Sequence, residues 1–216
     1  MNNNNMFVSD FDGTFTQYDF YDLVTKAFPE VLQYNDWTHY EEGKITHFEA
    51  LRRIFSRLRS PEHTIIDIIN KMTITSNLTN DINTLNTNGW NLVVASAGCD
   101  WYIKKLLGSN LDKLTLYANP GTYSSESGLS MTRADIGVFS SDNLGVNKLA
   151  IVEDAMKRYH QVAFAGDGRP DLEPVLIVPS DKRFAKGWLA QKLDSLNEAY
   201  VPFSDWSEII PYLIKE

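Results

Sequence analysis

The chain has 216 residues, of which 43% are hydrophobic and 22% are charged, and its formal net charge at pH 7 is -8. These values are ordinary for a globular protein, and no apolar run approaches the roughly 20 residues that cross a bilayer, so no membrane partner is expected. The acidic balance, without a basic stripe interleaved with aromatic residues, argues against a nucleic-acid partner. The length predicts one catalytic domain with a modest insertion.

Cys99 is the only cysteine, which excludes an internal disulfide and a cysteine-based metal cluster. A single cysteine fits a reducing compartment. The first six residues form an asparagine-rich run without a basic region or an apolar stretch, so they do not resemble a secretory signal. We therefore expect a cytoplasmic protein.

Short apolar runs with the character of strands recur along the chain, with helical patterns between most of them. They cover residues 6–9, 91–96, 114–118, 162–165 and 175–178. This alternation predicts an α/β fold with a Rossmann-like parallel sheet.

The stretch between the first two expected strands breaks the alternation, because it contains several helix-like segments and no convincing strand. Phe48, Leu51 and Phe55 recur at helical spacing, and Pro61 begins a further helix. Tyr21 belongs to an aromatic pattern more typical of a packed core than of a substrate site. The sequence therefore predicts a catalytic core of residues 1–14 and 89–216, with a separate helical unit of residues 15–88.

After the third expected strand, residues 119–143 are rich in Ser, Gly and Asp and predict a loop or a short hairpin. Helices are expected over residues 148–158, near 185–197 and over 205–214.

The most informative motif is the octet Phe-Val-Ser-Asp-Phe-Asp-Gly-Thr at residues 7–14. A turn at Gly13 would let Asp10 and Asp12 converge at the carboxyl end of the strand. The pair alone is compatible with metal binding, acid/base chemistry or a simple turn.

Two further signals lie at the starts of expected helices. Ser96, Ala97 and Gly98 end the second strand, where a hydroxyl and free amides suit a phosphate, although Ser96 could simply cap the helix. Lys148 follows a loop that contains Gly and Asn, and in isolation it reads as a solvated surface charge.

A fourth signal, Gly-Asp-Gly-Arg-Pro-Asp at residues 166–171, follows another strand. A surface turn explains its glycines and its proline but not an aspartate directly at the strand end. Asp167 is therefore a candidate ligand. In an open α/β sheet all four signals would meet at the carboxyl ends of the strands.

Together these residues suit attack of a carboxylate on a phosphoryl group, followed by hydrolysis of the acyl phosphate. Mg²⁺ held by Asp10 and Asp167 would offset the negative charge. Lys148 and the Ser96 hydroxyl with its neighbouring amides would hold phosphoryl oxygens, and Thr14, which closes the octet, is assigned to the same group. Asp12 would protonate the leaving oxygen, which requires a raised pKa.

In their order, these four motifs resemble the haloacid dehalogenase superfamily of hydrolases. The resemblance implies Mg²⁺ dependence, with Asp10 as nucleophile and Asp12 as general acid/base with its backbone carbonyl on the metal. It also implies Asp167 as the second carboxylate ligand and Asp171 as support for the metal shell. The helical unit of residues 15–88 resembles the small cap that many members place over the site.

Within the superfamily the chain resembles the phosphoserine phosphatase-like branch, which includes a methionine-salvage phosphatase acting on 2-hydroxy-3-keto-5-methylthiopentenyl-1-phosphate. Phosphoserine phosphatases usually carry Ser or Thr where Gly13 stands, and a cap glutamate near Asp19. Arg53 falls near their carboxylate-binding arginine. Asp19 and Arg53 are therefore the possible cap contacts of a small phosphorylated metabolite.

Two other functions stay open at this level. A phosphotransferase or mutase would pass the phosphoryl group from Asp10 to a second hydroxyl, which the sequence does not distinguish from hydrolysis. A non-catalytic binding domain would call for losses at the catalytic positions, and none is visible.

Overall fold

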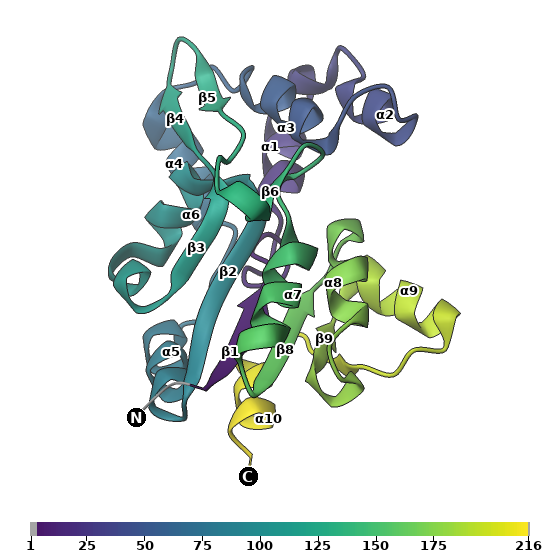
Figure 1. Cartoon of the computed structure of the whole chain (residues 1–216). Helices are drawn as coiled ribbons and strands as arrows, with labels where there is room; N and C mark the ends of the chain where they lie inside the picture. Colours follow the sequence, from purple (N-terminus) through teal and green to yellow (C-terminus); the bar gives the residue numbers. More distant parts are fainter. Residues whose placement is uncertain (1–3, 216) are drawn as a thin grey trace.

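The computed structural model describes residues 4–215 and shows an α/β protein built on a six-stranded sheet (Figure 1). The strand order is β10-β9-β8-β1-β2-β3, and all five neighbouring pairs are parallel. The strands of this sheet are β1 (Asn5–Ser9), β2 (Trp90–Cys99), β3 (Thr115–Asn119), β8 (Gln161–Gly166), β9 (Arg183–Ala185) and β10 (Val201–Pro202). The predicted α/β class with a parallel sheet is confirmed.

Helices cover both faces of the sheet, so the central strands carry apolar side chains on both sides. Phe7 of β1 packs in one apolar cluster with Leu92, and its neighbour Val8 packs in a second cluster with Val93 and Phe164. Alternation along the strand places the two side chains on opposite faces. Burial of each such side chain contributes about 1.5–3 kcal/mol.

Five of the helices that cover these faces follow β2 in the chain. They are α6 (Asp100–Leu107), α7 (Lys148–Arg158), α8 (Leu172–Leu176), α9 (Gly187–Leu196) and α10 (Ile210–Ile214). The bounds of α7 agree with the predicted helix, which Asn147 caps by accepting the Ala150 amide at 3.0 Å. Within residues 4–215, no helix combines the length and the apolarity that crossing a bilayer requires.

Between β1 and β2 the chain forms helices and no strand of the sheet, as the sequence predicts. These helices are α1 (Phe20–Ala27), α2 (Asp36–Glu41), α3 (His47–Phe55), α4 (Glu62–Asn70) and α5 (Leu78–Thr87). The first three lie above the carboxyl ends of the strands (Figure 1). By contrast, α5 contacts β2 and α10. We propose that the cap consists of α1 to α4 and that α5 belongs to the core, which moves the boundary to before residue 88.

Residues 119–143 contain an antiparallel hairpin, β4 (Gly121–Ser124) with β5 (Gly128–Met131), and a second small ribbon follows, β6 (Ser140–Ser141) with β7 (Gly145–Val146). The first hairpin reaches up beside the cap (Figure 1). The Tyr123 hydroxyl lies 2.9 Å from the Leu58 carbonyl oxygen and accepts the Ser60 amide at 3.2 Å.

A second attachment joins the same region of the core to the start of α3. Asn143 accepts the His47 amide through its side chain at 3.1 Å and the Phe48 amide through its carbonyl at 2.8 Å. The cap is therefore held by a part of the chain distant in sequence from its two connections to the sheet.

One predicted strand is wrong. Residues 175–178 belong to the end of α8 and the segment after it, and the next strand of the sheet is instead β9. An apolar run of four residues fits a buried strand and a buried helical turn equally well. Here the preceding turn at Arg169–Asp171 leads directly into a helix, and Pro174 lies in its first turn, where a proline is tolerated.

Candidate active site

The carboxyl end of β1 turns sharply at the octet, and this turn places the two aspartates. The Asp10 amide still pairs with the Ala165 carbonyl of β8 at 2.9 Å, after which the chain leaves the sheet. Gly13 adopts φ +70°, and a Cβ there would lie 2.5 Å from Asp167 Oδ2. Glycine is therefore required both by the backbone conformation and by the close approach of Asp167.

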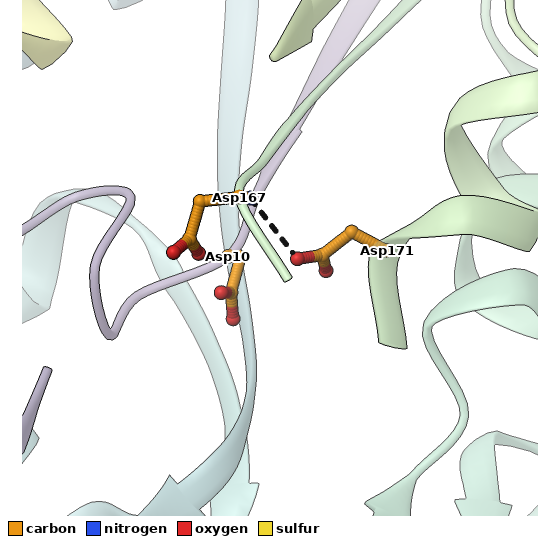
Figure 2. A group of neighbouring side chains, drawn as sticks. All are labelled: Asp10, Asp167 and Asp171. Atoms are coloured by element: carbon orange, nitrogen blue, oxygen red, sulfur yellow. Dashed lines mark hydrogen bonds between the residues drawn. The ribbon is translucent and has the colours of Figure 1, made fainter. Parts of the chain in front are cut away.

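Three carboxylates converge at this point. Asp10, Asp167 and Asp171 each offer an oxygen atom, and the three atoms lie within 4.8 Å of one another (Figure 2). They come from the end of β1, the end of β8 and the turn that follows β8. Asp171 is fixed by accepting the backbone amides of Asp167 at 3.2 Å and of Gly168 at 3.0 Å.

Lys148 supplies the cation nearest to this cluster. Its ammonium group lies 2.6 Å from Asp10 Oδ1 and 2.7 Å from Asp171 Oδ1, and its side chain is 3% exposed. Burial opposes the charged form, but Asp10 and Asp171 outweigh it and raise the pKa of Lys148. A lysine that in isolation reads as a surface charge is thus buried against the carboxylates with which it was predicted to share a site.

One ammonium group does not offset three carboxylates. Burial, and then the charge of Asp171, raises the pKa of Asp10 well above its ordinary value and that of Asp167 to about 6. A further cation would remove this repulsion. Oxygen ligands from several carboxylates are what Mg²⁺ prefers, so the donor set fits the ion that the resemblance implies.

Asp12 lies in a different environment from Asp10. Its Oδ2 accepts the Tyr102 hydroxyl at 2.8 Å and the Ser96 hydroxyl at 3.2 Å, and its Oδ1 accepts the Phe20 amide at 3.3 Å. Burial raises the pKa of Asp12, and these hydrogen bonds oppose the rise. The two carboxylates of the octet are therefore distinguished by their partners: a lysine for Asp10, hydroxyl and amide donors for Asp12.

The Ser96–Gly98 segment, at the end of β2, lies beside Asp12. The Gly98 amide donates to Ser96 Oγ at 2.9 Å. A Cβ on Gly98 would lie 1.8 Å from the Tyr102 hydroxyl and 2.8 Å from Asp12 Oδ2. A glycine is needed here so that Tyr102 can reach Asp12.

Tyr102 is a contact that the sequence analysis did not assign. It is fully buried on α6 and stacks on Phe20 of the cap, with ring centroids 4.3 Å apart. Its position three residues after Cys99 gives no sign of this role, because the contact depends on how α6 packs against the first turn of the cap.

These residues line one cavity of about 400 Å³ between the sheet and the cap. Its core wall includes most of the predicted site residues, namely Asp10, Asp12, Ser96, Ala97, Gly98, Lys148, Asp167 and Asp171. Its cap wall includes Asp19, which caps α1 by accepting the Tyr21 amide at 2.6 Å.

Two predicted site residues are placed differently. The Thr14 hydroxyl donates to Asp167 Oδ1 at 2.8 Å, and Thr14 is not part of the cavity wall. Arg53 is also outside the wall, because its guanidinium is paired with Glu49 Oε1 at 2.7 Å and with Asp36 Oδ1 at 3.4 Å.

Known proteins with a similar sequence or a similar fold are phosphatases and related hydrolases. No protein-family model matches the chain. A curated 2-hydroxy-3-keto-5-methylthiopentenyl-1-phosphate phosphatase from Bacillus velezensis is 24% identical over 209 residues, covering 94% of this chain and 87% of that protein.

Among solved structures, a HAD family hydrolase from Salmonella enterica serovar Typhi superposes with a TM-score of 0.71 at 16% identity, over 99% of this chain and 72% of its own. A phosphoserine phosphatase solved as an analogue of its phospho-aspartyl intermediate gives a TM-score of 0.64 at 22% identity, over 96% of this chain and 97% of its own. The chain has the haloacid dehalogenase fold and is phosphoserine phosphatase-like in structure.

Proposed function

We propose that the chain is a Mg²⁺-dependent phosphatase that hydrolyses a small phosphomonoester through a phospho-aspartate at Asp10. The observation that carries the proposal is that Asp10 and Asp12 line one cavity but have different partners. Asp10 lies against Lys148 and two further carboxylates, whereas Asp12 lies among hydroxyl and amide donors. Two carboxylates in different environments can serve as nucleophile and as proton carrier.

In the first step, an oxygen of Asp10 attacks phosphorus and the bond from phosphorus to the ester oxygen breaks. Asp12 gives its proton to the departing alkoxide, so the alcohol leaves neutral. In the second step, the Asp12 carboxylate takes a proton from water as the water oxygen attacks phosphorus. The bond to Asp10 then breaks, which releases inorganic phosphate and restores both carboxyl groups.

Asp10 and Asp167, with Asp171 beside them, would hold the Mg²⁺ ion, which when bound offsets the negative charge of the phosphoryl group. The ammonium group of Lys148 and the Ser96 hydroxyl with the Ala97 and Gly98 amides would hold the phosphoryl oxygens. For this the Ser96 hydroxyl would exchange its contact with Asp12, and the Gly98 amide its contact with Ser96 Oγ, for the phosphate. The fit of the buried acidic cluster to a hard cation supports this assignment.

Phosphate release from a chromogenic phosphate ester tests the proposal. We expect release with Mg²⁺ and none from Asp10→Asn, whereas Asp181→Asn, at an exposed carboxylate outside the cavity, should behave as the unmodified protein. Activity that survives in Asp10→Asn would contradict the phospho-aspartate. A phosphoryl group that passes to an added alcohol in preference to water would indicate a phosphotransferase instead.

The natural substrate calls for a panel of phosphorylated metabolites. The phosphoserine phosphatases and the methionine-salvage enzyme supply two of its members, phosphoserine and 2-hydroxy-3-keto-5-methylthiopentenyl-1-phosphate. The cap wall of the cavity would choose among them, because the phosphoryl pocket is common to all.

A further inference from the structure

The cap wall of the cavity carries a group of aromatic rings, here called the aromatic cluster: Tyr21, Trp37, Tyr40 and His47. Trp37 is its centre, with ring centroids 4.4 Å from Tyr21, 5.2 Å from Tyr40 and 5.6 Å from His47. The rings come from α1, α2 and the first residue of α3. The first three rings are only partly buried, so they are accessible from the cavity instead of being sealed in the cap.

Three carboxylates lie on the same wall. Asp19 and Asp22 flank Tyr21 in the sequence, and Glu41 follows Tyr40 at the end of α2. The basic residues that line the cavity, within the part of the chain that the structure describes, are Lys148 and Arg169, and both belong to the core. Burial, and then the charge of Asp12, raises the pKa of Asp19 well above its ordinary value. Among its described residues, the cap therefore contributes carboxyl groups, and no lysine or arginine, to this end of the cavity.

Two arginines of the cap, Arg53 and Arg57, are paired away from the cavity. Arg53 binds Glu49 and Asp36, and Arg57 donates to Asp36 Oδ2 at 2.6 Å and to the Val31 carbonyl at 2.9 Å. A substrate that carried a carboxylate opposite its phosphate would meet carboxylates on the cap wall instead of a cap arginine.

Carboxylates surround Tyr21, whereas His47 lies within reach of the positive charge of Lys148. Burial, followed by the charges of Asp22, Asp19 and Glu41, raises the pKa of Tyr21 to about 12. Burial, and then the charge of Lys148, lowers the pKa of His47 to about 4, so its ring is neutral near pH 7 and adds no positive charge. His47 also keeps a buried Nδ1 without a hydrogen-bond partner.

Aromatic faces beside carboxylates attract a cation, through the quadrupole of each ring and through direct charge attraction. We propose that the leaving alcohol of the substrate carries an ammonium group and no carboxylate, and that this group lies against Tyr21, Trp37 and Tyr40. The substrate is then a monophosphate of an amino alcohol. This inference rests on the proposed function, because the phosphate of the same molecule must reach Asp10.

Four phosphate esters separate the possibilities: phosphocholine, its uncharged isostere 3,3-dimethylbutyl phosphate, phosphoethanolamine and phosphoserine. The isostere has the shape of phosphocholine without its charge. We expect kcat/KM for phosphocholine to exceed that for the isostere about tenfold, as a desolvated ammonium–aromatic contact supplies. We also expect phosphoethanolamine to exceed phosphoserine. Comparison of the two amines shows whether the cluster prefers a methylated or a primary ammonium group.

Two variants connect the preference to the cap wall. Trp37→Leu and Glu41→Gln should each bring the phosphocholine-to-isostere ratio of kcat/KM towards one. Glu30→Gln removes an exposed cap carboxylate outside the cavity and should leave that ratio at its original value. Glu41 is itself exposed, so its variant tests the proposal even if Trp37→Leu does not fold.

An isostere hydrolysed as well as phosphocholine would overturn the ammonium assignment. Phosphoserine hydrolysed faster than phosphoethanolamine would overturn the exclusion of a carboxylate from the substrate. Both results would leave the phosphatase intact. If the chromogenic ester and all four of these esters remain uncleaved, the phosphatase itself is wrong. The two failures are therefore distinguishable.

Discussion

At the scale of single residues, Lys148 is the cation that pairs with the acidic cluster of Asp10, Asp167 and Asp171. Its ammonium group is the direct partner of both Asp10 and Asp171, and all three side chains are buried. Removal of one partner from a buried ion pair leaves charge without compensation and costs about 3–5 kcal/mol.

Lys148→Met should therefore lower the free energy of unfolding by about 3–5 kcal/mol at pH 7.5 without metal, and it should abolish phosphatase activity. The loss should be smaller at pH 5.5. A carboxyl group whose folded pKa is raised, as that of Asp167 is to about 6, contributes stability below that pKa and loses it as the pH rises through it. Urea unfolding at the two pH values measures the effect.

Lys157→Met, at an exposed lysine on the same helix, is the matched control and should change stability little. Equal stability of Lys148→Met and the unmodified protein at pH 7.5 would show that the lysine does not compensate the cluster.

Tyr102 acts on Asp12 and is a positioning residue for the proposed proton transfers. Tyr102→Phe keeps the stacking on Phe20 and loses only the hydroxyl. Because a hydrogen bond to a charged group contributes about 1.5–3 kcal/mol, we expect kcat to fall about tenfold or more with little change in KM. Steady-state kinetics across pH would also show a displaced pH profile.

Tyr123→Phe provides the comparison, since it removes a tyrosine hydroxyl that binds the loop of residues 58–60 and not Asp12. If both variants lose the same activity with unchanged pH profiles, Tyr102 has only a structural role.

The sequence predicts the residues whose chemistry fixes their type, and it fails where a role depends on packing. The positions of the two aspartates of the octet and of Asp167 are predictable because strand ends of a parallel sheet meet at one edge. Lys148 begins α7 and is predictable only in combination with them. Tyr102 and Trp37 are not, because any buried helix carries aromatic residues. The sequence does not indicate the bond from Thr14 to Asp167 for a similar reason, since a hydroxyl beside a carboxylate binds whichever acceptor the turn presents.

At the scale of elements, α3 begins with a buried histidine that the fold keeps neutral. The pKa of His47 falls from an ordinary 6.5 to about 4, mainly through burial. Below pH 6.5 the unfolded chain takes up a proton that the folded chain does not. The stability from this group is present in full above 6.5 and is lost as the pH falls from there towards 4.

We expect His47→Phe to reduce the acid sensitivity of folding. Between pH 7.5 and 4.5 the unmodified protein should lose about 2 kcal/mol more unfolding free energy than His47→Phe, which keeps a ring in the same place. Urea unfolding at both pH values measures this difference, in which the contributions of the carboxylates largely cancel. His63→Phe, at an exposed histidine, should follow the unmodified protein, and the same behaviour of His47→Phe would contradict the prediction.

Elements with a strong local signal are predicted well. The helix over residues 148–158 has an asparagine cap and a clear apolar face, and its bounds agree with α7. The apolar run at 175–178 carries no signal of its own, and its state is set by the turn before it. The packing of α5 on β2 is hidden for a related reason, because an amphipathic helix has the same pattern whether it packs on the cap or on the sheet.

At the scale of the whole molecule, the net charge is -8, and the acidic cluster contributes to it. A cation that binds this cluster only in the folded chain should stabilise the entire fold. With Mg²⁺ at about a hundred times its Kd, the expected gain is about 2.7 kcal/mol, or roughly 5–10 °C in Tm for a chain of this size. The gain should be larger at pH 7.5 than at 5.5, because protons compete for Asp167, whose pKa is about 6. Thermal unfolding in Mg²⁺ and in EDTA measures it.

Asp167→Asn should remove most of the Mg²⁺-dependent shift in Tm, and Asp181→Asn should retain it. A shift that persists in Asp167→Asn would place the ion elsewhere.

The attachment of the cap through Tyr123 and Asn143 has a mechanical consequence. Two chain segments connect the cap to the sheet, and a domain connected in this way can rotate about the axis that joins its two connections. The hydrogen bonds of Tyr123 and Asn143 hold the cap away from that axis and prevent the rotation unless they break. Entry and exit of small molecules therefore require either that the hydrogen bonds of Tyr123 and Asn143 break or that the cavity stays open to solvent without movement of the cap.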